Sequence, residues 1–101
     1  MDRKMMQQLQ QMQTKLVKAQ EELGNTEVEG TAGGGAVKVT MNGHRELRGL
    51  EIAPEAVDPD DVETLQDMIV AAFNDASKKA QDLSESKLGG LTGGMKIPGL
   101  F

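Results

Sequence analysis

The side chains best placed to do chemistry in this sequence are positive charges close to its N-terminus. Over residues 1–20 the only acid is Asp2, and the bases are Arg3, Lys4, Lys15 and Lys18, a local net charge of +3. Displacement of counterions from phosphates by such side chains supplies most nonspecific affinity for nucleic acids. Glutamines between these bases can hydrogen-bond phosphate, sugar or base edges: Gln7, Gln8, Gln10 and Gln11. These residues, together with Lys78 and Lys79, are the candidates for contacts with DNA phosphates.

The rest of the chain is acidic, which limits how tightly it can hold a polyanion. The 101 residues carry 16 acidic and 11 basic side chains, a net charge of −5. Screening confines attraction to roughly 8 Å at physiological salt, so the positive stretch can still bind phosphates weakly. The alternative is that Lys and Gln form an ordinary solvated helix face. No helix-turn-helix, zinc finger or long basic region is recognisable, so we expect low sequence specificity.

Residues that could support catalysis or bind a cofactor are sparse. The sequence has no Cys and one His, His44, which excludes thiol nucleophiles and zinc–thiolate sites. The glycines at 33–35 are followed by neither Lys-Ser nor Lys-Thr, as a P-loop requires. The acids from Asp58 to Glu63 lack the Gly and the final Glu of an EF-hand. We therefore expect a non-enzyme without catalytic residues, metal, cofactor or small-molecule substrate.

A helix must position the basic stretch. Residues 2–23 contain no Gly or Pro and are rich in Gln, Lys, Met and Leu, which favour helix. Apolar residues recur at steps of 4, 3, 4, 3 and 4, the spacing of a coiled-coil seam: Met5, Leu9, Met12, Leu16, Ala19 and Leu23. At about 1.5 Å per residue this helix is roughly 33 Å long, so part of it should project from a small domain. Gly24 and Asn25 should end it.

Between residues 26 and 52 the apolar period changes to two, which predicts strands. Val28 lies between two glutamates, and Val37, Val39 and Met41 alternate with polar residues. The glycines at 33–35 separate the first two strands, and Asn42-Gly43 is typical of a type I′ hairpin turn into the third. These signals predict a meander of three antiparallel strands. A change of parity in the last strand predicts a β-bulge at Gly49.

A second helix is predicted from Asp58 to about Lys87. Asp58 is expected to be its N-cap and Pro59 its first residue, followed by acids that favour a helix N-terminus. Its buried face should consist of Val62, Leu65, Ile69, Ala72 or Phe73, Ala76, Ala80 and Leu83. Glycines then recur through the last residues. We therefore expect one domain over residues 1–88 and a flexible tail with scattered apolar residues over 89–101.

The first helix carries more apolar side chains than so small a domain can cover. Seven large ones lie in residues 2–23, and a three-stranded sheet already covered by the second helix has little apolar surface left. We therefore predict a homodimer whose interface consists of Met5, Leu9, Met12, Leu16, Leu23, Val37 and Val39. The predicted fold class is α+β, in the order α-β-β-β-α, with a long N-terminal helix and a three-stranded antiparallel meander.

No part of the sequence suggests a membrane partner. The N-terminus lacks an apolar run of signal-peptide length, and no stretch approaches the roughly 18 apolar residues of a membrane span. The absence of Cys is consistent with a reducing compartment. We therefore expect a cytoplasmic protein.

Landmarks along nearly the whole chain resemble one known family, the YbaB/EbfC family of bacterial nucleoid-associated proteins. They are MMQQLQQM at 5–12, VKVTMNG at 37–43, LEIAP at 50–54, DPDDVETLQDMIVAAFNDA at 58–76 and PGLF at 98–101. The resemblance implies a dimer whose helices project from a shared sheet body like tweezers. It also implies a nucleoid protein that binds DNA, alters its shape and affects gene expression.

A second interpretation keeps the same elements but assigns them another partner. In it, the seam of the first helix and the apolar tail dock onto another protein, and the bases only keep the surface soluble. Added salt distinguishes the two, because contacts with several phosphates weaken steeply with salt and apolar contacts do not.

Overall fold

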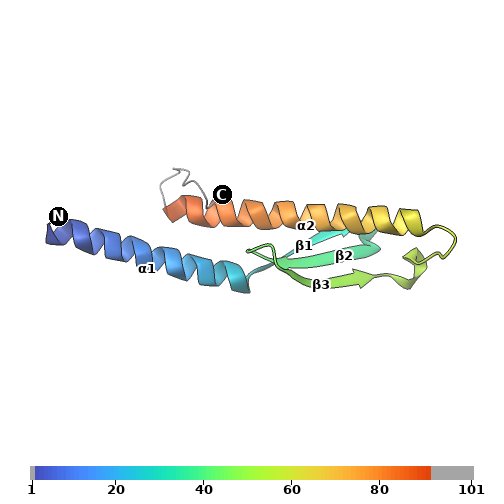
Figure 1. The fold of residues 1–101 in the computed structure, drawn as a ribbon, viewed down its shortest axis with the longest axis horizontal. Coiled ribbons are helices and arrows are strands. Elements are labelled where there is room, and N and C mark those ends of the chain that lie inside the picture. The colour runs from blue at the N-terminus through green and yellow to red at the C-terminus, as the bar shows by residue number, and fades with distance from the viewer. Residues whose placement is uncertain (1, 92–101) are drawn as a thin grey trace.

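The chain folds into two helices and a three-stranded sheet, which confirms the predicted α+β class and element order. The structure is a computed structural model that describes residues 2–91. The elements are α1 (Arg3–Asn25), β1 (Glu27–Ala32), β2 (Val37–Asn42), β3 (Leu47–Ile52) and α2 (Val62–Leu91), with short 3-10 turns at Gly33–Gly35 and Pro54–Ala56. Figure 1 shows α2 lying along the sheet and α1 extending away from it.

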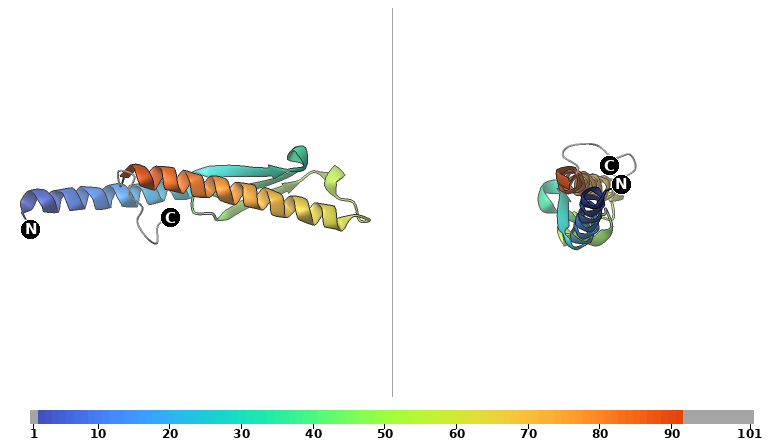
Figure 2. Two further views of the ribbon diagram at one scale, coloured as in Figure 1. Left: turned by 90° about the horizontal axis from the view of Figure 1, so that it is seen from above. Right: turned by 90° about the vertical axis from the view of Figure 1, so that its left-hand side faces the viewer.

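The helix α1 begins as its sequence predicts. Asp2 caps it, since its carboxylate accepts a hydrogen bond of 2.7 Å from the backbone N–H of Met5. The helix continues through Gly24 and Asn25, two residues beyond the predicted end. Its N-terminal half projects past the end of α2, as expected from its length (Figures 1 and 2).

The sheet is the predicted antiparallel meander, with strand order β1-β2-β3. Val37 and Val39 pair with Ile52 and Leu50, so these side chains share one face. The register then shifts, because Thr40 pairs with Gly49 while the next residue, Met41, pairs with Leu47. The predicted bulge is present, but its extra residue is Arg48, one residue before the predicted Gly49.

The β2–β3 turn differs from the prediction of a type I′ turn at Asn42-Gly43. Four residues, 43–46, connect the strands, and the residue with positive φ is Arg45 at 62°. Asn42 is buried and its side chain holds the loop, accepting from the N–H groups of His44 and Glu46 and donating to the Gly24 carbonyl. The N–H of Gly43 donates to the Leu23 carbonyl at 2.8 Å. The Asn-Gly pair therefore joins the hairpin to α1 instead of forming a tight turn.

Both ends of α2 differ from the sequence prediction. The residue that caps it is Asp61, whose carboxylate accepts from the N–H and the hydroxyl of Thr64. Asp58 instead holds the preceding turn by accepting from the N–H of Asp60 at 2.9 Å. The helix ends at Leu91 rather than near Lys87, so glycines 89 and 90 are helical. Residues 92–101 of the predicted tail lie outside the described residues.

The main core lies between α2 and two of the three strands. Val37, Val39 and Met41 are fully buried against Ala72 and Ala76. The sequence left Ala72 and Phe73 as alternatives for the buried position, and the structure buries Ala72, whereas Phe73 is 44% exposed.

A second, smaller cluster fixes the C-terminal half of α1 to the last turns of α2. Ala19 and Leu23 are buried with Leu88. Leu16, Leu83 and Leu91 pack at the edge of this cluster. An ion pair of 2.7 Å between Lys87 and Glu22 joins the same two helices. The direction and position of α1 are therefore set by α2 and by the β2–β3 loop.

Candidate nucleic-acid interface

The projecting half of α1 is the part of the described chain most accessible to a large partner. Every residue from Asp2 to Lys15 is exposed. The helix is held only at its C-terminal half, where the small apolar cluster and the Lys87–Glu22 ion pair anchor it. Side chains on the N-terminal half can therefore meet a surface as wide as a DNA duplex.

The four predicted phosphate-binding residues lie together on one side of this helix. At 3.6 residues per turn, Arg3, Lys4, Lys15 and Lys18 fall within about one third of the helix circumference. We call this set the basic face. The same geometry places Gln7 and Gln11 between the bases, with Gln8 and Gln10 at the two margins. The structure thus brings the predicted basic and glutamine residues of α1 onto one exposed surface.

The basic face is directed away from the apolar seam. Met5, Leu9, Met12, Leu16, Ala19 and Leu23 form the opposite side of the same helix at this spacing. The C-terminal part of the seam faces α2, because Ala19 and Leu23 are buried against Leu88. Contact between α1 and another part of the protein along the seam therefore leaves the bases free.

The bases of the basic face also form no ion pair within residues 2–91. None of its four bases has a carboxylate within ion-pair distance there, and the ion pairs are made by Lys38, Arg48, Lys79 and Lys87. Among the four bases, Lys18 is close enough to Glu22 for its charge to act on that carboxylate, though less than the charge of Lys87 does. The hydrogen bond and charge of Lys87, followed by the charge of Lys18, lower the pKa of Glu22 below its ordinary value. The positive charge of the basic face thus remains available to phosphates.

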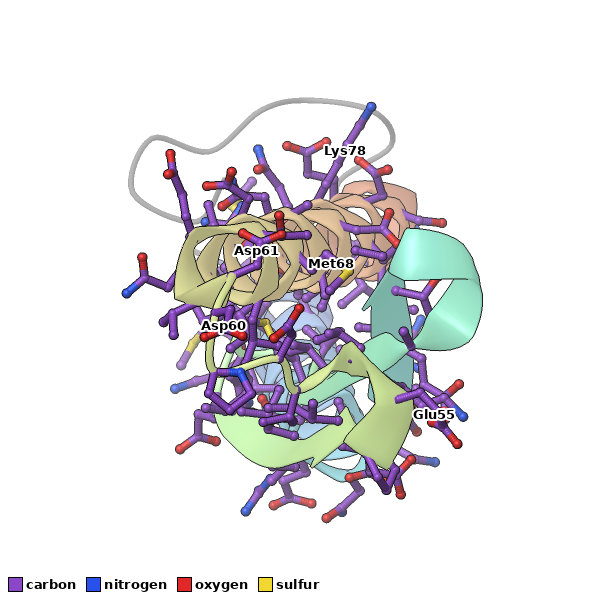
Figure 3. All side chains as sticks on the ribbon, turned by 90° about the vertical axis from the view of Figure 1, so that its right-hand side faces the viewer. Glu55, Asp60, Asp61, Met68 and Lys78 are labelled. Carbon is purple, nitrogen blue, oxygen red and sulfur yellow. The ribbon has the colours of Figure 1, made fainter. Side chains whose placement is uncertain are left out.

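Lys78 and Lys79 are not brought to the basic face. Leu91 packs at the edge of the small cluster that anchors α1, and Lys78 lies 13 residues before it, about 20 Å back along α2. Lys78 extends into solvent from α2 (Figure 3). Lys79 donates to the Glu29 carbonyl at 2.9 Å and pairs with Asp75 at 3.3 Å. Lys79 therefore helps to hold α2 against β1.

Three residues predicted for the dimer interface belong to the interior of the single chain. Leu23, Val37 and Val39 are 0%, 0% and 1% exposed, because α2 covers them. In the single chain they have no exposed surface for a second copy, and the position of a dimer interface stays a prediction. Met5, Leu9 and Met12 are about half exposed, and Leu16 lies at the edge of the small cluster.

An exposed apolar surface that the sequence did not single out lies beside α2. Leu47 and Leu50 share a sheet face with buried Met41 and Val39, yet they are 56% and 46% exposed. Asp75 and Lys79 reach β1, so the opposite flank of α2 is directed toward β3. That flank carries Val62 and Phe73, 50% and 44% exposed. We call these four residues the open face: Leu47, Leu50, Val62 and Phe73.

The sequence contains a weak signal for the open face. In the sequence, Leu47 is odd-numbered whereas Leu50 and Ile52 are even-numbered, and this change predicted a bulge that would place all three on one side of β3. That pattern showed that β3 has an apolar side. It did not show that α2 covers β1 and β2 and leaves this side open.

Two other features of the described residues bear on its possible partners. Within residues 2–91, no group of three or more His, Asp or Glu side chains is arranged to hold a metal ion. No helix in this part of the chain is both long and apolar enough to cross a membrane.

Comparison with known proteins gives concordant matches over nearly the full length. The sequence profile of the YbaB/EbfC DNA-binding family matches residues 1–95. The chain is 64% identical over 97 residues to a nucleoid-associated protein from Roseiflexus sp., covering 96% of each chain. It is 62% identical over 98 residues to one from Pelotomaculum thermopropionicum, covering 97% of this chain and 93% of the relative.

A solved structure shows the same fold. The crystal structure of an uncharacterized protein from Helicobacter pylori superposes with a TM-score of 0.77 at 26% sequence identity. The match covers 91% of this chain and 98% of the other.

Proposed function

The chain belongs to the YbaB/EbfC DNA-binding family, and from this premise we propose that it is a nucleoid-associated protein that binds duplex DNA with low sequence specificity and alters its conformation. The observation that carries the proposal is the basic face of α1, the helix whose N-terminal half projects from the body. Its four bases are exposed, unpaired within the described residues and directed away from the apolar seam.

The charge distribution explains how an acidic protein binds a polyanion. Residues 1–20 carry a net charge of +3, and residues 21–53 and 54–101 carry −3 and −5. We call the projecting half of α1 the arm, and the sheet with most of α2 the body. Because the Debye length is about 8 Å at physiological salt, phosphates near the arm are attracted by its positive charge more than they are repelled by the acidic body. The acidic body therefore restricts binding to the arm and keeps the affinity modest.

The kinds of side chain on the arm favour low sequence specificity. Arg and Lys on a single exposed helix face contact phosphates, which carry no sequence information directly. The glutamines are able to reach base edges. However, no second element of the described chain lies beside them to fix α1 in a DNA groove, as direct readout of the bases requires. The function is binding and shaping of DNA in the bacterial nucleoid, without enzymatic activity.

The proposal includes a homodimer, because two arms can hold two duplexes together or bend one duplex between them. The open face supports it, since four large apolar residues stand half exposed beside the core. The chain exposes 7174 Å², whereas a compact monomer of its mass exposes about 5,500 Å². A second copy that covers the open face leaves both basic faces free. This placement replaces Leu23, Val37 and Val39 in the predicted interface.

The test is to neutralise the basic face and measure DNA binding as a function of salt. We replace Arg3, Lys4, Lys15 and Lys18 with glutamine and record mobility shifts of a duplex of arbitrary sequence. The logarithm of the binding constant should fall less steeply with the logarithm of salt, with a slope smaller by up to about 3.6 per arm, or about 0.9 for each lost phosphate contact. Binding at low salt should weaken strongly.

A matched control removes two bases from the body of the protein. Lys38 and Arg48 lie in the sheet, so their replacement by glutamine should leave the salt slope nearly unchanged. Unchanged affinity in the quadruple variant would remove α1 as the DNA-binding surface. Absence of DNA binding by the wild type even at low salt would favour a protein partner instead.

A further inference from the structure

The last carbonyl groups of α1 are bonded to a distant part of the chain. An α-helix leaves the carbonyls of its last four residues without partners inside the helix. Thr26, which follows α1, satisfies part of this need, because its hydroxyl donates to the Glu22 carbonyl at 2.7 Å and its N–H donates to the Leu23 carbonyl at 3.4 Å. Further donors come from residues 42–46, the end of β2 and the β2–β3 loop. We call residues 42–46 the clamp.

Two buried residues of the clamp hold the end of α1. The Asn42 amide donates to the Gly24 carbonyl at 3.1 Å, and the Gly43 N–H donates to the Leu23 carbonyl at 2.8 Å. The Asn42 side chain also accepts from two N–H groups of its own loop, so the position of α1 is tied to the conformation of the loop. Gly43 lies so close to α1 that an added Cβ would be 2.7 Å from the Leu23 carbonyl oxygen.

The next two residues of the clamp each contact a different helix. The ring of His44 bonds through Nε2 to the Gln20 carbonyl of α1 at 2.8 Å. The guanidinium group of Arg45 donates to the Gln81 side chain of α2. Arg45 has a φ of 62°, a left-handed conformation that a residue other than glycine keeps only where its surroundings hold it. The clamp is therefore bonded to both helices at once.

The held part of α1 is shorter than its free part. From Leu16 to Leu23, where α2 and the clamp contact it, the helix advances 7 residues, or about 11 Å. From Leu16 to Met5 it advances 11 residues, or about 17 Å. A tilt of α1 about Leu16 therefore moves Met5, and the bases Arg3 and Lys4 beside it, farther than it moves Leu23.

We infer that the clamp fixes the direction of the arm and thereby determines the shape that bound DNA adopts. The DNA part of this inference rests on the proposed function. A duplex that contacts both arms of a dimer must follow their directions, and bending it costs more free energy as the angle grows. Substitutions in the clamp leave all four bases of the basic face in place. They should therefore change the shape of the complex much more than the number of phosphate contacts.

The first test measures the direction of the arm without DNA. Gly43→Ala places a methyl group against a backbone oxygen of Leu23, so the loop and the end of α1 must separate. The chain has no Cys, so spin labels can be attached to cysteines introduced at two exposed positions, Gln8 and Ser86. An excess of unlabelled chains confines the measured distances to one chain. We expect Gly43→Ala to displace the distribution of label–label distances from that of the wild type.

The matched control is Gly49→Ala in the same hairpin. Its added Cβ would meet only the Thr40 side chain, at 3.9 Å, so it should leave the distance distribution unchanged. A second variant, His44→Ala, alters an exposed side chain and removes the contact with Gln20, so it should keep the circular dichroism spectrum and also displace the distribution. His44→Gln keeps a side-chain donor and should displace it less. Distributions that match the wild type in both Gly43→Ala and His44→Ala would overturn the inference.

The second test separates the shape of DNA from its affinity. Energy transfer between dyes at the two ends of a short duplex reports its end-to-end distance at saturating protein. Gly43→Ala should change this distance, while the salt slope of binding stays within about 0.9 of the wild-type value, the contribution of one phosphate contact. Neutralising the basic face should instead reduce the slope.

The outcomes of the two tests distinguish this inference from the proposed function. A displaced arm with an unchanged end-to-end distance of the duplex would overturn the inference. A wild type that leaves the shape of the duplex unchanged would overturn the proposed function, whereas the label distances, which need no DNA, would still decide whether the clamp fixes the arm.

Discussion

Single charged residues serve two different purposes in this molecule. Asp75 accepts a hydrogen bond of 3.1 Å from the N–H of Thr31 and pairs with Lys79, whose ammonium group also reaches the Glu29 carbonyl. These contacts fasten the middle of α2 to β1. The bases of the basic face make no such contacts within residues 2–91, so they remain free to bind a ligand. Whether a charged side chain stabilises the fold or is free to bind a ligand therefore depends on whether its helix packs against another element at that point.

The contacts of Asp75 predict an acid-sensitive contribution to stability. The hydrogen bond from Thr31, and then Lys79, lower the pKa of Asp75 below its ordinary value of 3.8. A carboxylate with a depressed pKa stabilises the fold fully above its ordinary pKa, and this contribution is lost as the pH falls toward the folded-state value. Asp75→Asn should therefore lower the melting temperature at pH 7 and reduce its decline below pH 4. Calorimetry between pH 7 and pH 3 measures both effects.

The control for this prediction is Asp67→Asn, which alters an exposed carboxylate on the same helix. It should leave the melting temperature at pH 7 within the small range typical of surface substitutions. If Asp75→Asn and Asp67→Asn gave the same pH profile, the Thr31 and Lys79 contacts would not contribute to stability.

At the scale of elements, the close approach of α2 to β1 depends on one glycine. Gly30 is buried under α2, and a Cβ added there would lie 2.2 Å from both the Ala72 carbonyl oxygen and the Ala76 nitrogen. Both are backbone atoms of a helix, so they cannot move aside as a side chain would. The small residues Ala72 and Ala76 on the facing side of α2 allow the same close contact.

This contact predicts a large effect for a single methyl group. Gly30→Ala should lower the free energy of unfolding by about 1–3 kcal/mol or more, because α2 must shift away from its core. Denaturant titration followed by circular dichroism measures the change. Gly49→Ala is the matched strand control, since its added Cβ would meet only the Thr40 side chain at 3.9 Å. Equal stability of the two variants would show that α2 does not pack as closely as the structure describes.

At the scale of the whole molecule, the part that is proposed to form the dimer and the part that is proposed to bind DNA lie at opposite ends. The body contains the sheet and most of α2, and its open face stands beside the core. The arm is the free half of α1, and it extends the molecule to 69 Å in its longest dimension against 20 and 17 Å in the others. A homodimer formed by the bodies would therefore present two separate arms to DNA.

The proposed dimer predicts how mass should respond to two sets of substitutions. The wild type should sediment with twice the mass of the 10.8-kDa chain. Leu50→Asp with Phe73→Asp should shift it to the mass of one chain, because charges on the open face oppose burial. Both side chains are about half exposed in the single chain, so the variant should keep its circular dichroism spectrum.

The corresponding control places charges on the exposed part of the seam. Met5→Asp with Leu9→Asp should leave the mass at that of two chains if the body forms the dimer. A monomer from this control, together with a dimer from the open-face variant, would assign the interface to α1 and contradict the proposal.

The sequence by itself determined the parts of this protein that depend on local periodicity. Apolar residues at helical spacing predicted α1, and the same spacing gathered its bases on the side opposite the seam. Alternation predicted the three strands, and the change of parity predicted the bulge at Arg48 and Gly49. These patterns are recorded within one segment, because each depends only on the geometry of its own backbone.

Only the tertiary structure decided which of these surfaces are covered. Val37 and Leu50 carry the same apolar signal in the sequence, yet α2 buries the first and leaves the second 46% exposed. Asn42-Gly43 predicted a tight turn, but in the structure the N–H of Gly43 donates to the Leu23 carbonyl of α1, so this pair joins the hairpin to that helix. Burial and partner choice depend on which distant elements meet, and the pattern of a single segment does not contain that information.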